Sequence, residues 1–122
     1  MTQKTVLTVD DSPSIRRMIA MTLSEAGYAV VEACDGRDGL AKATAQPVDA
    51  IITDQNMPEL DGLGFIRALR QHPMGRGVPV IVLSTDSAEE LKAQAREAGA
   101  LGWMVKPFTQ DKLLAVIRKV LG

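Results

Sequence analysis

The segment of residues 49–58, with the sequence DAIITDQNMP, is the feature that most constrains the fold of this chain. Its apolar run is short and continuous and is bounded by turn residues, which is typical of a strand buried on both faces of a parallel sheet. Asp54 lies at the carboxyl end of this run, and Pro58 ends the pattern. Because open parallel sheets bind their ligands at the carboxyl ends of strands, Asp54 is the first candidate for a functional side chain.

The composition indicates one globular domain spanning residues 1–122. Hydrophobic residues make up 46% and charged residues 24%, which argues against a disordered chain. Fourteen basic and fifteen acidic residues give a net charge of -1, so we expect no nucleic-acid partner. The single cysteine, Cys34, excludes an intramolecular disulfide, and we expect it to be buried. We expect no signal peptide, and no apolar run approaches the roughly 20 residues that span a bilayer, which favours a cytoplasmic location.

Apolar runs alternate five times with segments of helical spacing. Strands are expected near residues 6–9, 28–31, 50–53, 78–83 and 103–105. Helices are expected near 13–26, 37–45, 63–72 and 113–121, with another that is capped within 84–87 and ends near 98. This alternation predicts an α/β fold of the flavodoxin-like (βα)5 type, a three-layer sandwich whose parallel sheet has the strand order 2-1-3-4-5.

That strand order gathers polar side chains at one edge of the sheet. Asp10 and Asp11 follow the first strand, Asp54 the third, Ser84 the fourth and Lys106 the fifth. Neighbouring carboxylates repel one another unless a cation joins them, and a hard divalent ion with oxygen ligands points to Mg²⁺. A carboxylate on such an ion, flanked by a lysine and a hydroxyl, is suited to attack a phosphoryl group. The predicted product is an aspartyl phosphate.

Each of these residues also has a simpler interpretation. The acids at 10–11 could favour a helix N-terminus, and Asp54 could form an Asx-turn. At least one hydroxyl within 84–87 is expected to be a helix cap, and Lys106 alone could be a surface lysine. Their common placement at one edge favours a functional site.

The chain resembles the response regulator receiver domains over essentially its whole length, and the single-domain chemotaxis regulators (CheY-type) among them most. The resemblance rests on ordered motifs: VDDS at 9–12, DQNMPELDG at 54–62, Ser84 and KPF at 106–108, with SPSIRR at 12–17 typical of the chemotaxis subgroup.

This resemblance implies that Asp54 is the phosphoacceptor and that a histidine kinase is the phosphodonor. It implies Mg²⁺ bound by Asp11, Asp54 and the backbone carbonyl of Asn56, with Asp10 contributing through water. Lys106 would contact the phosphoryl group.

The resemblance assigns further roles around the phosphoacceptor. The Lys106–Pro107 peptide bond would be cis, a geometry found almost only before proline. The hydroxyl near the phosphoryl group would belong to Ser84, with Thr85 as the alternative.

Four positions would tune or transmit the signal. Asn56 and Asp86 would tune the lifetime of the phosphate. Trp103 occupies the switch position, where Tyr or Phe is more usual, and would shift between two conformations together with Ser84. Its alternative role is packing alone. Val116 departs from the family, whose target-binding members often carry a cation near that position.

The predicted function is a phosphorylation-switched binding module rather than an enzyme. The surface of the fourth helix, fifth strand and fifth helix would bind a flagellar motor switch protein. The alternatives are a relay to a histidine phosphotransfer domain and a phosphate sink; an aspartyl-phosphate phosphohydrolase or a flavin-binding electron carrier are more remote. We expect a monomer, with a dimer through the same surface as the alternative.

Overall fold

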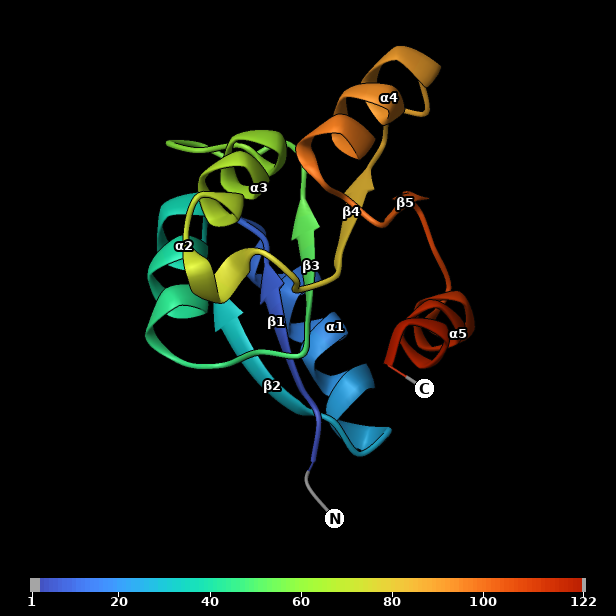
Figure 1. Cartoon of the computed structure of the whole chain (residues 1–122). Helices are drawn as coiled ribbons and strands as arrows, with labels where there is room; N and C mark the ends of the chain where they lie inside the picture. Colours follow the sequence, from blue (N-terminus) through green and yellow to red (C-terminus); the bar gives the residue numbers. More distant parts are fainter. Residues whose placement is uncertain (1–2, 122) are drawn as a thin grey trace.

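Within residues 3–121, which the structure describes, the computed structural model has five strands that alternate with five α-helices. The strands are β1 (Thr5–Val9), β2 (Ala29–Ala33), β3 (Ala50–Asp54), β4 (Val80–Ser84) and β5 (Gly102–Val105). The helices are α1 (Pro13–Glu25), α2 (Gly36–Ala45), α3 (Gly62–Arg70), α4 (Glu89–Ala98) and α5 (Gln110–Leu121), with a 3-10 turn, η1, at Pro73–Gly75. The sheet is parallel with the order β2-β1-β3-β4-β5, which confirms the predicted flavodoxin-like topology (Figure 1).

The helices cover both faces of this sheet. Consecutive residues of β1 and β3 point to opposite faces, because side chains alternate along a strand. One core lies beneath α2 and α3 and contains Leu7, Ile51 and Phe65. The other lies beneath α1 and α5 and contains Val6 and Ile52. These two cores confirm the three-layer sandwich, in which every residue of β3 is buried.

The strand register brings the functional edge together. Val9 pairs with Thr53, Asp54 with Leu83, and Ser84 with Val105. The carboxyl ends of β1, β3, β4 and β5 therefore meet at the same edge, where strand order 2-1-3-4-5 places β1 and β3 side by side (Figure 1).

Side chains cap the first three helices that begin at this edge. Ser12 caps α1 by accepting the Ile15 N–H at 3.4 Å, with Pro13 in the first turn as the sequence predicts. Asp35 caps α2, and Asp61 caps α3 by accepting the Gly64 N–H at 2.8 Å.

The expected cap of α4 is wrong. The helix begins only at Glu89, and Ala88 occupies the N-cap position without a side-chain hydrogen bond. The polar residues before it bond within the loop instead: Ser84 Oγ accepts the Asp86 N–H at 3.0 Å, and Asp86 Oδ1 accepts the Ala88 N–H at 2.8 Å. Such local bonds compete with capping, so the loop is longer than the sequence suggests.

The expectation for Cys34 is also wrong, because its side chain is exposed. Cys34 follows the last residue of β2 in the loop that leads to α2, and its N–H donates to Asp38 Oδ2 at 3.0 Å. The strand has ended at Ala33, so the buried alternation no longer applies to Cys34.

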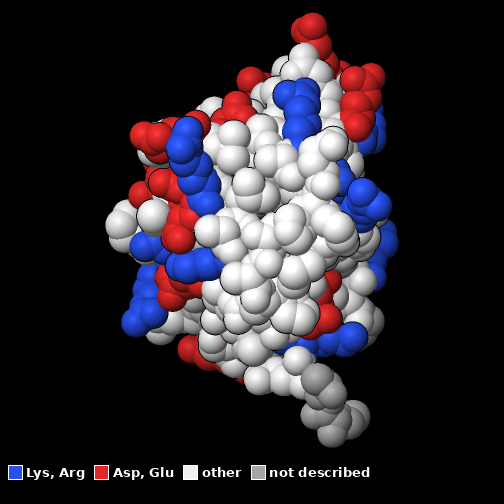
Figure 2. Space-filling model, turned by 60° about the vertical axis from the view of Figure 1, so that its left-hand side comes forward, with Lys and Arg blue, Asp and Glu red and all other residues white. Residues whose placement is uncertain are grey.

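The face that carries α2 and α3 is brought forward in Figure 2. It has a broad area without charges, framed by positive and negative side chains that lie interspersed. In the part of the chain that the structure describes, no helix is both long and apolar enough to cross a membrane.

Candidate functional site

Three carboxylates gather at the carboxyl edge of the sheet. Asp10 follows β1 directly, Asp11 comes next, and Asp54 is the last residue of β3. One carboxylate oxygen from each lies within 4.8 Å of the others. The structure therefore brings together the three acids that the sequence analysis singled out.

Lys106 reaches into this cluster from the end of β5. Its Nζ lies 3.0 Å from Asp54 Oδ1 and 3.7 Å from Asp10 Oδ2. Asp54 Oδ1 also accepts the N–H of Gln55 at 3.0 Å. Both partners are largely shielded from solvent, with side chains 15% exposed for Lys106 and 9% for Asp54. The ammonium is therefore a charge partner for two buried carboxylates at once.

Asp10 is the most enclosed of the three acids. Its Oδ1 accepts the N–H of Ser12 at 2.9 Å, whereas its Oδ2 is buried and has no hydrogen-bond partner. Burial raises the pKa of Asp10, and the Ser12 N–H and the charge of Lys106 oppose that rise. A buried oxygen without a hydrogen bond is costly, so this position favours a further cationic partner.

The donor set fits a magnesium ion. Mg²⁺ prefers oxygen ligands and keeps several waters, and it is commonly bound by one or two carboxylates. Asp10 Oδ2 has no hydrogen-bond partner and could accept a bond from a water of the ion. Asp11 is exposed, so one side of the cluster is open to solvent. Asn56 is exposed in the loop two residues after Asp54, and its carbonyl as a ligand stays a prediction.

Ser84 lies beside this cluster at the end of β4 and is 1% exposed. Its main-chain carbonyl accepts the N–H of Lys106 at 2.8 Å, which joins the ends of β4 and β5. Its Oγ accepts a hydrogen bond from Asp86, so the hydroxyl proton is free to be donated. Thr85, the alternative, is exposed in the loop.

The Lys106–Pro107 peptide bond is cis, as predicted. Trp103 is half-buried on β5, and its indole Nε1 donates to the main-chain carbonyl of Asp86 at 3.0 Å.

Two residues of this region were missed in the sequence analysis. Gln55 is buried, and its Oε1 accepts the N–H of Leu63 at 3.0 Å, which fixes the loop after Asp54 to the start of α3. Arg16 donates from Nη1 to the main-chain carbonyl of Asp10 at 2.6 Å. A glutamine directly after a candidate nucleophile was an available signal, whereas nothing in the spacing distinguishes Arg16 from Arg17.

The family model of the response regulator receiver domain matches residues 6–118. The chain belongs to this family. It is therefore a receiver domain of two-component signalling, a class of signalling proteins rather than of enzymes in the usual sense.

Curated relatives and solved structures agree with this assignment. A "Probable chemotaxis protein CheY" of Rhizobium etli is 36% identical over 118 residues, which cover 96% of this chain and 92% of the relative. The transcriptional regulatory protein PrrA of Mycobacterium bovis is 39% identical over 120 residues, which cover 98% of this chain and 51% of PrrA.

The structure of the chemotaxis protein CheY4 of Vibrio cholerae is 43% identical, with a TM-score of 0.95, over 98% of this chain and all of that one. The receiver domain of the histidine kinase PA1611 of Pseudomonas aeruginosa is 30% identical, with a TM-score of 0.90 and 99% of both chains covered. That structure is described with a magnesium ion coordinated in its active-site cleft.

Proposed function

We propose that this receiver domain, residues 1–122, accepts a phosphoryl group on Asp54 from a histidine kinase and then binds a partner protein in the cytoplasm. One observation carries the proposal: Lys106 Nζ lies 3.0 Å from the buried carboxylate of Asp54, within a cluster that also holds Asp10 and Asp11. The proposal makes the domain a phosphoacceptor that assists its own phosphorylation and dephosphorylation, and not an enzyme with a separate substrate.

In the proposed reaction an oxygen of Asp54 forms a bond to phosphorus as the bond from phosphorus to the donor breaks. The ammonium of Lys106 stabilises the negative charge on the phosphoryl oxygens, and the Ser84 hydroxyl donates a hydrogen bond to one of them. Bound Mg²⁺, held by Asp11, Asp54 and the carbonyl of Asn56 with Asp10 acting through water, would neutralise charge that Lys106 cannot neutralise alone.

Asn56 and Asp86 are proposed to set the lifetime of the phosphate. Both are exposed beside the site, so their side chains can influence a water molecule that approaches the phosphorylated Asp54. Ser84 and Trp103 are proposed as the switch that reports phosphorylation to the outer surface, because Ser84 lies at the site and Trp103 on the outermost strand.

The proposed partner surface lies beside Trp103. A groove of about 440 Å³ runs between β5 and α5, and its lining includes Leu101, Trp103, Val116 and Lys119. Lys119 supplies the cation that Val116 lacks, one helical turn further along α5. The likeness to chemotaxis proteins favours a flagellar motor switch protein as the partner. The alternatives are a relay that passes the phosphate to a histidine phosphotransfer domain and a sink that drains phosphate from a shared kinase.

The phosphorylation is tested with acetyl phosphate and Mg²⁺ on the wild type and on Asp54→Asn. The mass of the intact wild-type protein should increase by one phosphoryl group, and the fluorescence of Trp103, the single tryptophan, should change with it. Asp54→Asn should show neither change. Mg²⁺ binding without any gain in mass would contradict the phosphoacceptor role, and a gain in mass with constant fluorescence would contradict only the switch.

The partner surface is tested by comparing two substitutions of exposed apolar residues. Leu101 is 63% exposed and lines the groove, whereas Met21 is 55% exposed on α1. Leu101→Ser should weaken binding of the phosphorylated domain to a motor switch protein, and Met21→Ser should not. Equal effects of both substitutions, or binding to a histidine phosphotransfer domain alone, would contradict the motor assignment.

A further inference from the structure

The main chain of Asp10 is held from two sides. Its N–H donates to the carbonyl of Ala33 on β2 at 3.1 Å, and its carbonyl accepts from Nη1 of Arg16 at 2.6 Å. On the side chain, Oδ1 accepts the N–H of Ser12 at 2.9 Å. These bonds leave Oδ2 as the oxygen of Asp10 without a hydrogen bond, and this is the oxygen that faces Lys106 at 3.7 Å.

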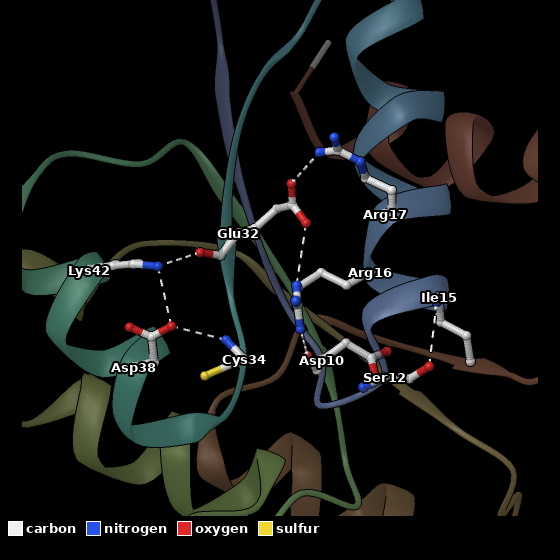
Figure 3. A network of polar contacts seen from close by, with 9 residues as sticks. All are labelled: Asp10, Ser12, Ile15, Arg16, Arg17, Glu32, Cys34, Asp38 and Lys42. Atoms are coloured by element: carbon white, nitrogen blue, oxygen red, sulfur yellow. Dashed lines mark hydrogen bonds and ion pairs between the residues drawn. The ribbon is translucent and has the colours of Figure 1, made fainter.

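Arg16 is itself fixed by an edge-strand carboxylate. Its Nε lies 3.3 Å from Oε1 of Glu32 on β2, so the guanidinium bridges Glu32 and the carbonyl of Asp10 (Figure 3). The other oxygen of Glu32 accepts from Arg17 Nη1 at 3.2 Å. Arg17 makes no bond to Asp10 in Figure 3 and its side chain is 71% exposed, whereas that of Arg16 is 18% exposed.

The main chain of Glu32 is held in turn by a lysine of α2. Its carbonyl accepts from Lys42 Nζ at 2.6 Å, and Lys42 also pairs with Asp38 on the same helix, α2. The loop after β1 is therefore connected through Arg16 to two neighbouring elements, β2 and α2, rather than to α1 alone (Figure 3).

We propose that Arg16, held by Glu32, is a positioning residue that keeps the carboxylates of Asp10 and Asp11 in place for the divalent cation. The inference rests on the proposed function, because it concerns the Mg²⁺ site assigned there. Arg16 contacts no ligand oxygen itself; it acts through the main chain of Asp10, and through that residue on the adjacent Asp11.

The sign of the effect separates positioning from charge. Arg16 is a cation bonded to the main chain of Asp10 beside the proposed ion site, so Coulomb repulsion alone predicts that its removal strengthens Mg²⁺ binding. Positioning predicts the opposite, because without Arg16 the carbonyl of Asp10 is no longer held and the loop must be ordered again when the ion binds. Removal of Arg17 takes the same charge from the same Glu32 and leaves the bond to Asp10 intact, so Arg17→Met is the matched control.

The experiment measures Mg²⁺ affinity by Trp103 fluorescence and by calorimetry, without phosphodonor, on the protein of residues 1–122. Arg16→Met is expected to raise the dissociation constant about 10-fold, the lower end for groups that orient metal ligands. Arg17→Met should change the dissociation constant by no more than about 2-fold, because an exposed charge contributes little and the bond to Asp10 stays intact. Arg16→Lys keeps the charge but lacks the planar guanidinium that bonds Glu32 and Asp10 together, so its dissociation constant should fall between those of wild type and Arg16→Met.

Urea denaturation without Mg²⁺ is measured on the same variants. Lower stability of Arg16→Met with unchanged or tighter Mg²⁺ binding would mean that Arg16 is only structural, and would overturn the inference. If Arg16→Met does not fold, Arg16→Lys replaces it and should weaken binding in the same direction although it keeps the charge. A wild type that binds no Mg²⁺ would overturn the cation site of the proposed function itself, which is a different result from equal binding by wild type and Arg16→Met.

Discussion

Ser84 and Trp103 both bond to the same residue, one to each side of its main chain. The hydroxyl oxygen of Ser84 accepts the N–H of Asp86 at 3.0 Å, and the indole Nε1–H of Trp103 donates to the carbonyl of Asp86 at 3.0 Å. Asp86 lies in the loop before α4, a helix that has no side-chain cap. If the Ser84 hydroxyl turns towards a phosphoryl group, Asp86 loses one of these bonds, and the position of Trp103 is affected through the other.

Trp103→Phe removes the indole donor and keeps an aromatic ring. We expect amide hydrogen exchange to become faster at residues 85–88, because the loop loses its bond to β5. The free energy of unfolding should fall by about 0.5–1.5 kcal/mol, the usual net value of one hydrogen bond. Mass-resolved exchange and urea denaturation followed by circular dichroism measure the two effects. Unchanged exchange in the loop would show that the bond does not hold it.

Ser84→Ala and Trp103→Phe should be coupled. Both side chains hold Asp86. The change in the free energy of unfolding of the double variant should therefore differ from the sum of the changes in the two single variants by at least about 0.5 kcal/mol, a typical value for residues that share a partner. A cycle of the wild type, two single variants and the double variant measures this coupling by urea denaturation. Additive changes would mean that the two bonds are independent.

The edge residues could be predicted because a parallel sheet determines where strand ends lie. Asp10, Asp54, Ser84 and Lys106 each follow or end an apolar run, and the strand order alone makes them neighbours. The direction of side chains within loops could not be predicted this way. The bonds from Trp103 to Asp86 and from Arg16 to Asp10 depend on rotamers and loop paths that have no sequence period.

The two wrong expectations have the same origin. At least one hydroxyl within residues 84–87 was expected to cap α4, but Ser84 bonds within the loop and the N-cap position falls on Ala88. Cys34 was assigned to the core by residue type, whereas β2 ends one residue earlier. Ser87 lies one residue before the N-cap position and Cys34 lies one residue after β2, and residue propensities do not resolve boundaries this closely.

Lys106→Met should destabilise the protein without Mg²⁺ by about 3 kcal/mol, the lower end for breaking a buried ion pair. The carboxylates of Asp54 and Asp10 lose their shared cation, whose Nζ lies 3.0 and 3.7 Å away. Saturating Mg²⁺ should recover much of this loss and should bind more tightly than to wild type, because no ammonium competes for the same oxygens. Urea denaturation with and without Mg²⁺ measures both effects.

Lys92→Met is the control for this substitution. Lys92 pairs with Glu89, whose side chain is 85% exposed, at 3.7 Å. A surface pair of this kind contributes at most about 1 kcal/mol, and Mg²⁺ should not restore it. Equal stabilisation of Lys106→Met and the wild type by Mg²⁺ would contradict the proposed exchange of one cation for another.

Asp10 should make stability without Mg²⁺ depend on pH. Because burial raises the pKa of Asp10 in the folded state, the folded protein keeps this proton at pH values where the unfolded chain has lost it. The contribution of Asp10 to the free energy of unfolding is therefore highest at pH values below 3.8, the pKa in the unfolded chain. It falls as the pH rises through the raised pKa of the folded protein. Asp10→Asn should remove this fall, so its stability relative to wild type should increase with pH in urea titrations with a chelator. A difference that is constant with pH would contradict the assignment.

Gly62 should be required for the geometry of the phosphoacceptor loop. A Cβ at this position would lie 2.7 Å from the carbonyl oxygen of Asp54 and 2.8 Å from Oε1 of Gln55. The carbonyl belongs to the main chain and cannot move without shifting the end of β3. Gly62→Ala should lower the free energy of unfolding by about 1–3 kcal/mol, as overpacking does, and slow phosphorylation of Asp54 by acetyl phosphate.

Gly77→Ala is the control, because nothing lies within 4 Å of a Cβ there. Its stability should stay equal or rise slightly, since alanine restricts the unfolded chain. Equal stability and phosphorylation rates for the two variants would show that the approach of α3 to Asp54 is not needed.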